Sequence, residues 1–224
     1  MGGKGIVVAV DGPSGSGKGA VARLAAGRLG YLYIDSGAMY RAVALLAREQ
    51  DIPLDDDTRV SELAAGISFR MEKTTEGVRV LAGERDLTEA IRQPQVSVGA
   101  SQVAVIPAVR KALVEQQKRM GSEGGIVMEG RDIGTVVFPH AELKIFLDAS
   151  VAERARRRHA QEREKGRESS PEETRKEIEE RDRRDQEREV SPLQKAEDAV
   201  YLDSTALLIN EVVEVIVRLA RERA

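Results

Sequence analysis

The stretch Val7-Val8-Ala9-Val10-Asp11 runs directly into Gly12-Pro13-Ser14-Gly15-Ser16-Gly17-Lys18. Its first part is apolar and rich in β-branched residues, which is typical of a strand buried on both faces. The next seven residues match G-x-x-x-x-G-K, and a stretch with helical spacing follows them. Between a strand and a helix, such a loop turns backbone N–H groups toward phosphate oxygens, and the helix N-terminus adds partial positive charge. We therefore predict a phosphate-binding loop in which Lys18 contacts the outer phosphates.

Strand and helix patterns alternate along the rest of the chain. Five apolar runs predict strands: Ile6–Val10, Leu32–Ile34, Ile126–Met128, Leu143–Leu147 and Ala199–Leu202. Six stretches have helical spacing: Lys18–Leu29, Tyr40–Glu49, Val96–Met120, Val151–Lys165, Pro171–Arg188 and Leu207–Arg223. This alternation predicts an α/β fold in which helices flank a central parallel sheet, within one domain that covers residues 1–224.

Two segments depart from this alternation. Ile67–Leu87 holds short alternating runs separated by glycines, which predicts a small antiparallel meander inserted in the parallel core. Val151–Glu189 holds 13 Lys and Arg and 13 Asp and Glu, so its helices are too charged to lie in a core. This segment is either a pair of solvated helices joined by a mobile turn around Gly166–Ser170, or a flap whose arginines meet an anionic ligand.

Composition excludes several classes of protein. The chain of 224 residues has no cysteine and two histidines, which excludes disulfides, a thiolate nucleophile and a Cys- or His-rich metal site. Its net charge of −3 and its 3% aromatic content argue against a nucleic-acid-binding protein. The apolar run near the start is far shorter than the ~20 residues of a membrane helix, so we expect a cytoplasmic protein without a membrane span. Arginine outnumbers lysine 26 to 9, which suits the binding of phosphate or carboxylate.

The phosphate-binding loop lacks one common element. Gly19 stands where Ser or Thr usually supplies a hydroxyl to Mg²⁺. We therefore expect the metal to be held by nucleotide phosphates, water and more distant carboxylates, and we assign it no direct protein ligand.

Two polar clusters follow predicted strands. Asp35-Ser36-Gly37-Ala38-Met39-Tyr40-Arg41 comes after the second strand, and Glu129-Gly130-Arg131-Asp132-Ile133-Gly134-Thr135 comes after the third. Taken singly, each cluster is explained as well by a helix cap and a surface arginine. Because ligands of parallel sheets gather beyond the carboxyl ends of the strands, the two clusters together predict a second anion-binding site that faces the phosphate-binding loop.

Five motifs in order resemble those of the bacterial cytidylate kinases, almost from end to end of the chain. They are Gly12–Lys18, Asp35-Ser36-Gly-x-x-Tyr40-Arg41, Gly130-Arg131-Asp132-x-Gly134-Thr135-Val136-Val137-Phe138-Pro139, Lys144–Ala149 and Glu180-Arg181-Asp182-x-x-Asp185. The G-K-G form of the loop also resembles the nucleoside monophosphate kinases more than the regulatory GTPases. The resemblance implies a P-loop kinase core with an inserted acceptor-side subdomain at about 67–91 and a helical lid at about 154–189.

The resemblance also implies roles for individual residues. It implies that the acceptor nucleotide is surrounded by Ser36, Arg41 and Arg131, and that its cytosine is read by Ser101, Arg110 and Asp132. It also implies that the sugar is contacted by Arg181 and Asp185, and the phosphate by Arg188. The donor ATP is bound by Gly12, Pro13, Ser14, Gly15, Ser16, Gly17, Lys18, Gly19 and Ala20, with Arg154, Arg157 and Arg158 closing over it. Catalysis is assigned to Lys18, Arg131 and Arg188. Without the resemblance, Ser101 and Arg110 are interpreted as ordinary helix surface.

The chemistry of cytosine agrees with this assignment. Cytosine presents an amino donor that the Asp132 carboxylate can accept, whereas uracil presents an acceptor that a carboxylate repels. The implied reaction is transfer of the γ-phosphoryl group of ATP to CMP or dCMP with Mg²⁺, by a protein that we expect to be a monomer. Ala20 replaces a Thr often found in the family, and we expect it to weaken donor binding modestly.

Two alternatives remain open at this point. The first is another P-loop kinase for a small substrate, such as UMP or shikimate. The second is a non-catalytic ATP-binding protein whose Glu- and Arg-rich helices dock a partner. Val151–Arg188 lacks sustained apolar heptad positions, which argues against a coiled coil in that role.

Overall fold

A computed structural model describes residues 5–75, 77–164, 166 and 170–224. Its centre is a five-stranded sheet in the order β2-β6-β1-β7-β8, and every neighbouring pair is parallel. The strands are β1 (Val7–Asp11), β2 (Leu32–Asp35), β6 (Ile126–Gly130), β7 (Leu143–Asp148) and β8 (Val200–Asp203). All five predicted strands are thus confirmed, as is the α/β class with a central parallel sheet.

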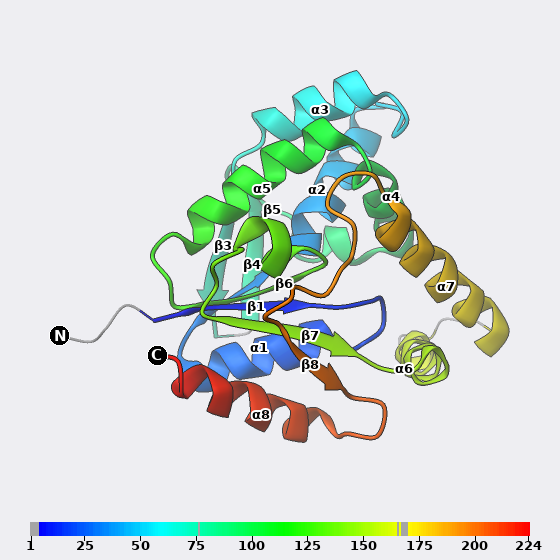
Figure 1. Ribbon diagram of the computed structural model, residues 1–224. Helices are drawn as coiled ribbons and strands as arrows, with labels where there is room; N and C mark the ends of the chain where they lie inside the picture. The colour runs from blue at the N-terminus through cyan, green and yellow to red at the C-terminus, as the bar shows by residue number, and fades with distance from the viewer. Residues whose placement is uncertain (1–4, 76, 165, 167–169) are drawn as a thin grey trace.

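Helices cover both faces of this sheet (Figure 1). On one face, α1 (Lys18–Leu29) and α8 (Ile209–Arg221) pack together against the strands through a buried apolar cluster that includes Val21, Val213 and Ile216. On the other face, α5 (Pro107–Gly121) and the short π-helical turn η2 (Ile133–Val137) cover β6 and β2. Because the strands are parallel, their carboxyl ends lie on the same side of the sheet, and the polar segments of the sequence follow these ends.

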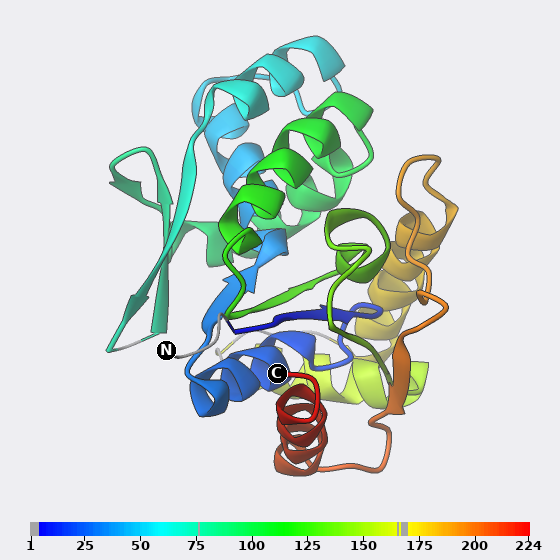
Figure 2. The ribbon, with the colours of Figure 1, turned by 60° about the vertical axis from the view of Figure 1, so that its left-hand side comes forward.

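A helical subdomain extends from the second face of the sheet. It contains α2 (Ser36–Glu49), α3 (Asp57–Gly66), η1 (Ala90–Arg92), α4 (Pro94–Val103) and part of α5, which share an apolar core. The antiparallel sheet β3 (Phe69–Thr74), β4 (Gly77–Ala82) and β5 (Arg85–Asp86) projects beside it, as Figure 2 shows. The predicted meander over Ile67–Leu87 is therefore present, while its role as an acceptor-side subdomain stays a prediction.

The predicted single helix over Val96–Met120 is wrong, because the structure has two helices there. Residue 107 is a proline at the start of α5, and Ile106 before it has extended backbone angles, φ −73° and ψ 116°. A proline ring clashes with the preceding turn, and it disfavours helical angles in the residue before it. The break lets α4 and α5 point in different directions, and each carries one residue predicted to read the base.

The charged segment forms α6 (Val151–Glu164) and α7 (Pro171–Glu187). These two helices pack on each other beyond the carboxyl ends of the strands (Figure 1). Ser170 and Glu173 form a reciprocal capping box at the start of α7, which fixes where that helix begins. The predicted mobile turn around Gly166–Ser170 includes residues 167–169, and these lie outside the described residues. Within the described part of the chain, no helix has the length and apolar character needed to cross a membrane.

Candidate active site

The phosphate-binding loop leaves the carboxyl end of β1 and enters α1, as predicted. A Cβ on Gly12 would lie 2.0 Å from the backbone oxygen of Leu147, so the loop can pass this close to β7 only with glycine there. The Nζ atom of Lys18 donates to the backbone oxygen of Pro13 at 2.7 Å, so the lysine folds back over its own loop. Burial lowers the pKa of Lys18 to about 7, helped by the nearby charge of Arg131. An incoming anion would reverse this effect by stabilising the charged form.

Glu129, at the end of β6, faces the start of α1. Its Oε1 atom accepts a hydrogen bond from the Tyr33 hydroxyl at 2.8 Å. Burial raises the pKa of Glu129, and the neighbouring charge of Asp35 raises it further. The structure therefore places a half-buried carboxylate beside the phosphate-binding loop, where a hydrated cation on the phosphates would stabilise its charged form.

The second predicted cluster is brought next to the first. The Ser36 hydroxyl donates to the backbone oxygen of Glu129 at 2.7 Å, which ties the start of α2 to the end of β6. Arg41 projects from α2 and donates to the Asp35 carboxylate at 2.6 Å. Because β2 and β6 are parallel neighbours, with Asp35 opposite Glu129, these groups share one edge of the sheet.

The predicted acceptor residues from three distant segments form one network of ion pairs. Asp132 contacts Arg110 from α5 through one oxygen, and its other oxygen lies 3.6 Å from Nη2 of Arg188. Arg131 donates from Nε to the Asp185 carboxylate of α7 at 2.7 Å. Arg110 is 2% exposed and also lies 5.5 Å over the ring of Tyr40, so its interpretation as helix surface is wrong.

Several buried polar atoms of these residues have no hydrogen-bond partner among the described residues. They are the Ser101 hydroxyl, Nε of Arg110, Nε of Arg181 and Nη2 of Arg188. Burial lowers the pKa of Arg181 to about 10, and the neighbouring charge of Arg131 contributes to this shift. Buried donors without a hydrogen-bond partner cost free energy in the absence of a ligand, so this cluster could bind an anionic molecule with polar edges.

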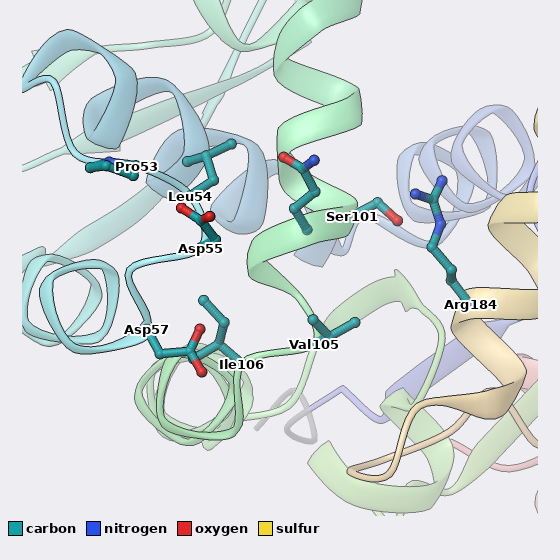
Figure 3. A pocket seen from close by; sticks show the side chains of 9 residues that line it. Pro53, Leu54, Asp55, Asp57, Ser101, Val105, Ile106 and Arg184 are labelled. Atoms are coloured by element: carbon teal, nitrogen blue, oxygen red, sulfur yellow. The ribbon is translucent and has the colours of Figure 1, made fainter.

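A cavity of about 650 Å³ is lined by one predicted acceptor residue, Ser101, and by none of the ion-paired residues above. As Figure 3 shows, Leu54 and Asp55 from the loop after α2, Ser101 from α4 and Arg184 from α7 line it. Ser101 is 8% exposed, so its interpretation as helix surface is wrong as well. The volume of the cavity falls within the usual range for small-molecule sites.

Arg184 is a candidate site residue that the sequence analysis missed. Its Nε atom is buried without a hydrogen-bond partner among the described residues. Arg184 lies three residues after Arg181 and four residues before Arg188, which is about one helical turn in each direction. It also precedes Asp185 directly. Arg184 therefore belongs to the same stripe of α7. Helical periodicity applied to the assigned residues would have found it.

The three arginines predicted to close over the donor differ in their surroundings. Arg154 is buried, donates to the backbone oxygen of Ser14 at 2.8 Å and pairs with Asp182, so it holds the phosphate-binding loop itself. Arg157 donates to the backbone oxygen of Ser204 at 2.6 Å, and Arg158 pairs with Glu162 at 3.0 Å. Two of these side chains thus connect α6 to neighbouring loops in this conformation.

Comparison with known proteins agrees with this geometry. The family model for cytidylate kinase matches residues 8–222. A cytidylate kinase from Geobacter sp. (strain M21) is 48% identical over 219 residues, covering 98% of this chain and 94% of that protein. One from Carboxydothermus hydrogenoformans is 49% identical over 206 residues, covering 92% and 93%. The structure of a gluconokinase from Sinorhizobium meliloti, at 18% identity, has a TM-score of 0.51 with coverage of 98% and 94%, which supports the kinase fold alone. The resemblance seen in the motifs is confirmed, and the chain belongs to the cytidylate kinase family, whose members are nucleotide kinases.

Proposed function

We propose that this protein transfers the γ-phosphoryl group of ATP to CMP or dCMP, giving ADP and CDP or dCDP. The observation that carries the proposal is the buried network around Asp132, in which a carboxylate lies together with buried donors that lack a hydrogen-bond partner among the described residues. Family membership and the phosphate-binding loop support the same conclusion.

Asp132 supplies the proposed preference for cytosine. A carboxylate offers about four lone-pair positions, so Asp132 can accept from the cytosine amino group while it keeps its contact with Arg110. The uracil oxygen at the same place would face the carboxylate without a proton between them. The Ser101 hydroxyl and the free Nε atom of Arg110 are the further donors available to the base.

The arginines bind and orient the acceptor phosphate in this proposal. Arg41, Arg131 and Arg188 would converge on it, with Arg181 and Asp185 at the sugar. The acceptor oxygen attacks the γ-phosphorus while the bond from that phosphorus to the bridging oxygen of ADP breaks. Since the acceptor phosphate is ionised near neutral pH, the reaction needs alignment and charge stabilisation more than a general base.

On the donor side, residues 12–20 would cradle the ATP phosphates, and Lys18 would turn from the Pro13 oxygen to the phosphates. Among the described residues, no cluster of three or more His, Asp or Glu side chains could hold a metal ion alone. Mg²⁺ would instead arrive bound to the ATP phosphates, and the Glu129 carboxylate would hold water ligands of that ion. When bound, Mg²⁺ neutralises charge on the transferred phosphoryl group.

Closure of α6 and α7 over the bound nucleotides would exclude water and limit hydrolysis of ATP. In this proposal Arg154 keeps the loop in place, while Arg157 and Arg158 exchange their present partners for the donor phosphates. We further propose that the protein acts as a monomer in the cytoplasm, with ATP and CMP or dCMP as its partners.

A panel of acceptors tests the proposed function. Purified protein is mixed with ATP, Mg²⁺ and, in turn, CMP, dCMP, UMP or shikimate, and ADP release is measured. We expect CMP and dCMP to be turned over far more efficiently than the others. Preference for UMP or shikimate would establish the first alternative, and ATP binding without turnover of any acceptor would establish the second.

A further inference from the structure

Asp11 is a buried carboxylate to which the proposed reaction assigns no role. It is the last residue of β1, directly before Gly12, and it is 5% exposed. One oxygen accepts a hydrogen bond from the backbone N–H of Ile133 at 2.9 Å, and the other accepts from the N–H of Gly134 at 2.7 Å. Each oxygen of the carboxylate therefore accepts from one short segment that lies 122 residues later in the chain.

The two N–H groups open the turn η2, which follows Gly130-Arg131-Asp132 without a spacer. The first amides of a helical turn have no partner within the turn, so they must be satisfied from outside. Asp11 is well placed to do this, because it lies opposite Gly130 in the register of β1 and β6. Its side chain thus reaches past the end of β6 to the residues just beyond Asp132.

The other end of the same segment is also fixed. The backbone oxygen of Glu129 receives the Ser36 hydroxyl, and a Cβ on Gly130 would lie 2.6 Å from that hydroxyl oxygen. Arg131 and Asp132 therefore lie between two anchored points. A Cβ on Gly134 would lie 3.4 Å from Asp11 and 3.2 Å from Lys144, which leaves the turn little room for another position.

The surroundings of Asp11 argue against a purely space-filling role. A buried carboxylate costs free energy that its hydrogen bonds offset in part, whereas an apolar side chain would fill the same space without that cost. Burial raises the pKa of Asp11 to about 6, and of the nearby charges Asp132 raises it further while Lys18 lowers it. Asp11 directly precedes the donor loop and bonds to the turn that follows Asp132, so it connects the donor loop with the acceptor network.

We propose that Asp11 is a positioning residue for the acceptor site, which holds Arg131 and Asp132 in place through the two amides of the turn that follows them. This inference rests on the proposed function, because it specifies how the acceptor residues of that same site are oriented. Asp11 itself touches neither substrate.

The test compares Asp11→Asn with the unchanged protein and with Asp86→Asn. Asparagine has nearly the same shape, but its amide nitrogen cannot accept from an N–H, so one of the two amides loses its partner. We expect kcat/KM for CMP to fall about tenfold or more, while the Kd of ATP measured by calorimetry changes by less than about twofold. Asp86 is the matched control, because it is exposed and caps the turn after β5 by accepting from Thr88 at 2.9 Å.

Asp11→Ser is measured in parallel, since it leaves both amides without the carboxylate, and we expect a larger loss of the same selective kind. Unchanged use of CMP by Asp11→Asn, or equal losses in CMP use and ATP binding, would overturn the proposal. Failure of both variants to fold would overturn it as well, because the carboxylate would then be required for the fold as a whole. If the unchanged protein does not phosphorylate CMP, the proposed function itself has failed, so the two failures are distinguishable.

Discussion

A Cβ atom on Gly19 would lie 2.8 Å from Oε1 of Glu129 and 3.5 Å from the hydroxyl oxygen of Tyr33. The Glu129 carboxylate thus occupies the space that a Ser or Thr side chain would need at the end of the phosphate-binding loop. This contact gives a steric reason for the G-K-G form of the loop. The absence of a hydroxyl side chain at Gly19 is therefore explained by the position of the Glu129 carboxylate.

The first prediction concerns this contact. In Gly19→Ala, the new methyl group displaces the Glu129 carboxylate and weakens its hydrogen bond with Tyr33. The better helix propensity of alanine offsets part of this loss, so we expect the free energy of unfolding to fall by less than about 1 kcal/mol, and the Mg²⁺ concentration for half-maximal activity to rise several-fold. Denaturant titration and a Mg²⁺ titration measure the two effects.

Gly27→Ala is the matched control for this prediction. Gly27 lies in the same helix, and a Cβ there would meet nothing within 4 Å. This substitution should therefore stabilise the protein slightly, through the better helix propensity of alanine, and leave the Mg²⁺ dependence unchanged. An equal response of the two variants would show that the Gly19 contact has no special importance.

The second prediction concerns the choice of base. Asp132→Asn replaces an acceptor oxygen with an amide that can donate to the uracil oxygen. We expect the ratio of kcat/KM for CMP to that for UMP to fall about 10- to 100-fold, which corresponds to ~1–3 kcal/mol for an unpaired buried group. Steady-state kinetics with both nucleotides measure this ratio. An unchanged ratio would contradict the placement of Asp132 at the base.

The third prediction concerns Arg184. In Arg184→Met, the side chain keeps much of its bulk but loses its buried donor. We expect the KM for CMP to rise about three- to tenfold, with little change in the Kd of ATP. Arg183→Met is the matched control, because Arg183 is the neighbouring residue of α7, is exposed, and pairs only loosely with Glu187 at 3.8 Å. If the two variants have the same KM for CMP, Arg184 is not part of the acceptor site.

The fourth prediction concerns pH. Burial lowers the pKa of Lys18 to about 7 in the protein without ligand, and bound phosphates raise it again because they stabilise the ammonium form. Near pH 8 most Lys18 side chains are neutral before ATP binds and charged afterwards, so binding takes up a proton. Near pH 5.5 the lysine is already charged and the uptake vanishes.

Calorimetry of Mg-ATP binding in buffers of different ionisation enthalpy measures this proton uptake. The affinity for ATP should correspondingly decline as the pH rises above 7, since protonation of Lys18 then costs free energy. Equal proton uptake at both pH values would show that Lys18 is not the group that titrates.

The sequence predicted the strands and the donor loop well because these features are local. Val7–Val10 is a continuous apolar run that predicts a buried strand, and the glycine pattern after it predicts a phosphate-binding loop. Ser101 and Arg110 were harder, since each lies on a helix whose buried face depends on the direction set by the break at Pro107. The pairing of Asp11 with Ile133 and of Gly19 with Glu129 depends on strand order, which no local pattern reveals. The residue roles within the site remain predictions.

The strand order has a consequence for how the chain folds during synthesis. β1 is made first, yet both its neighbours, β6 and β7, belong to the second half of the chain, with pairing partners such as Ile126 and Leu143. The ribosome must therefore produce more than a hundred further residues before the first strand can enter its final position. Long-range parallel pairing of this kind folds slowly, and its apolar segments are exposed to aggregation in the meantime. The helical subdomain lies between β2 and β6 in the sequence and has its own apolar core, so it can form before β1 is paired.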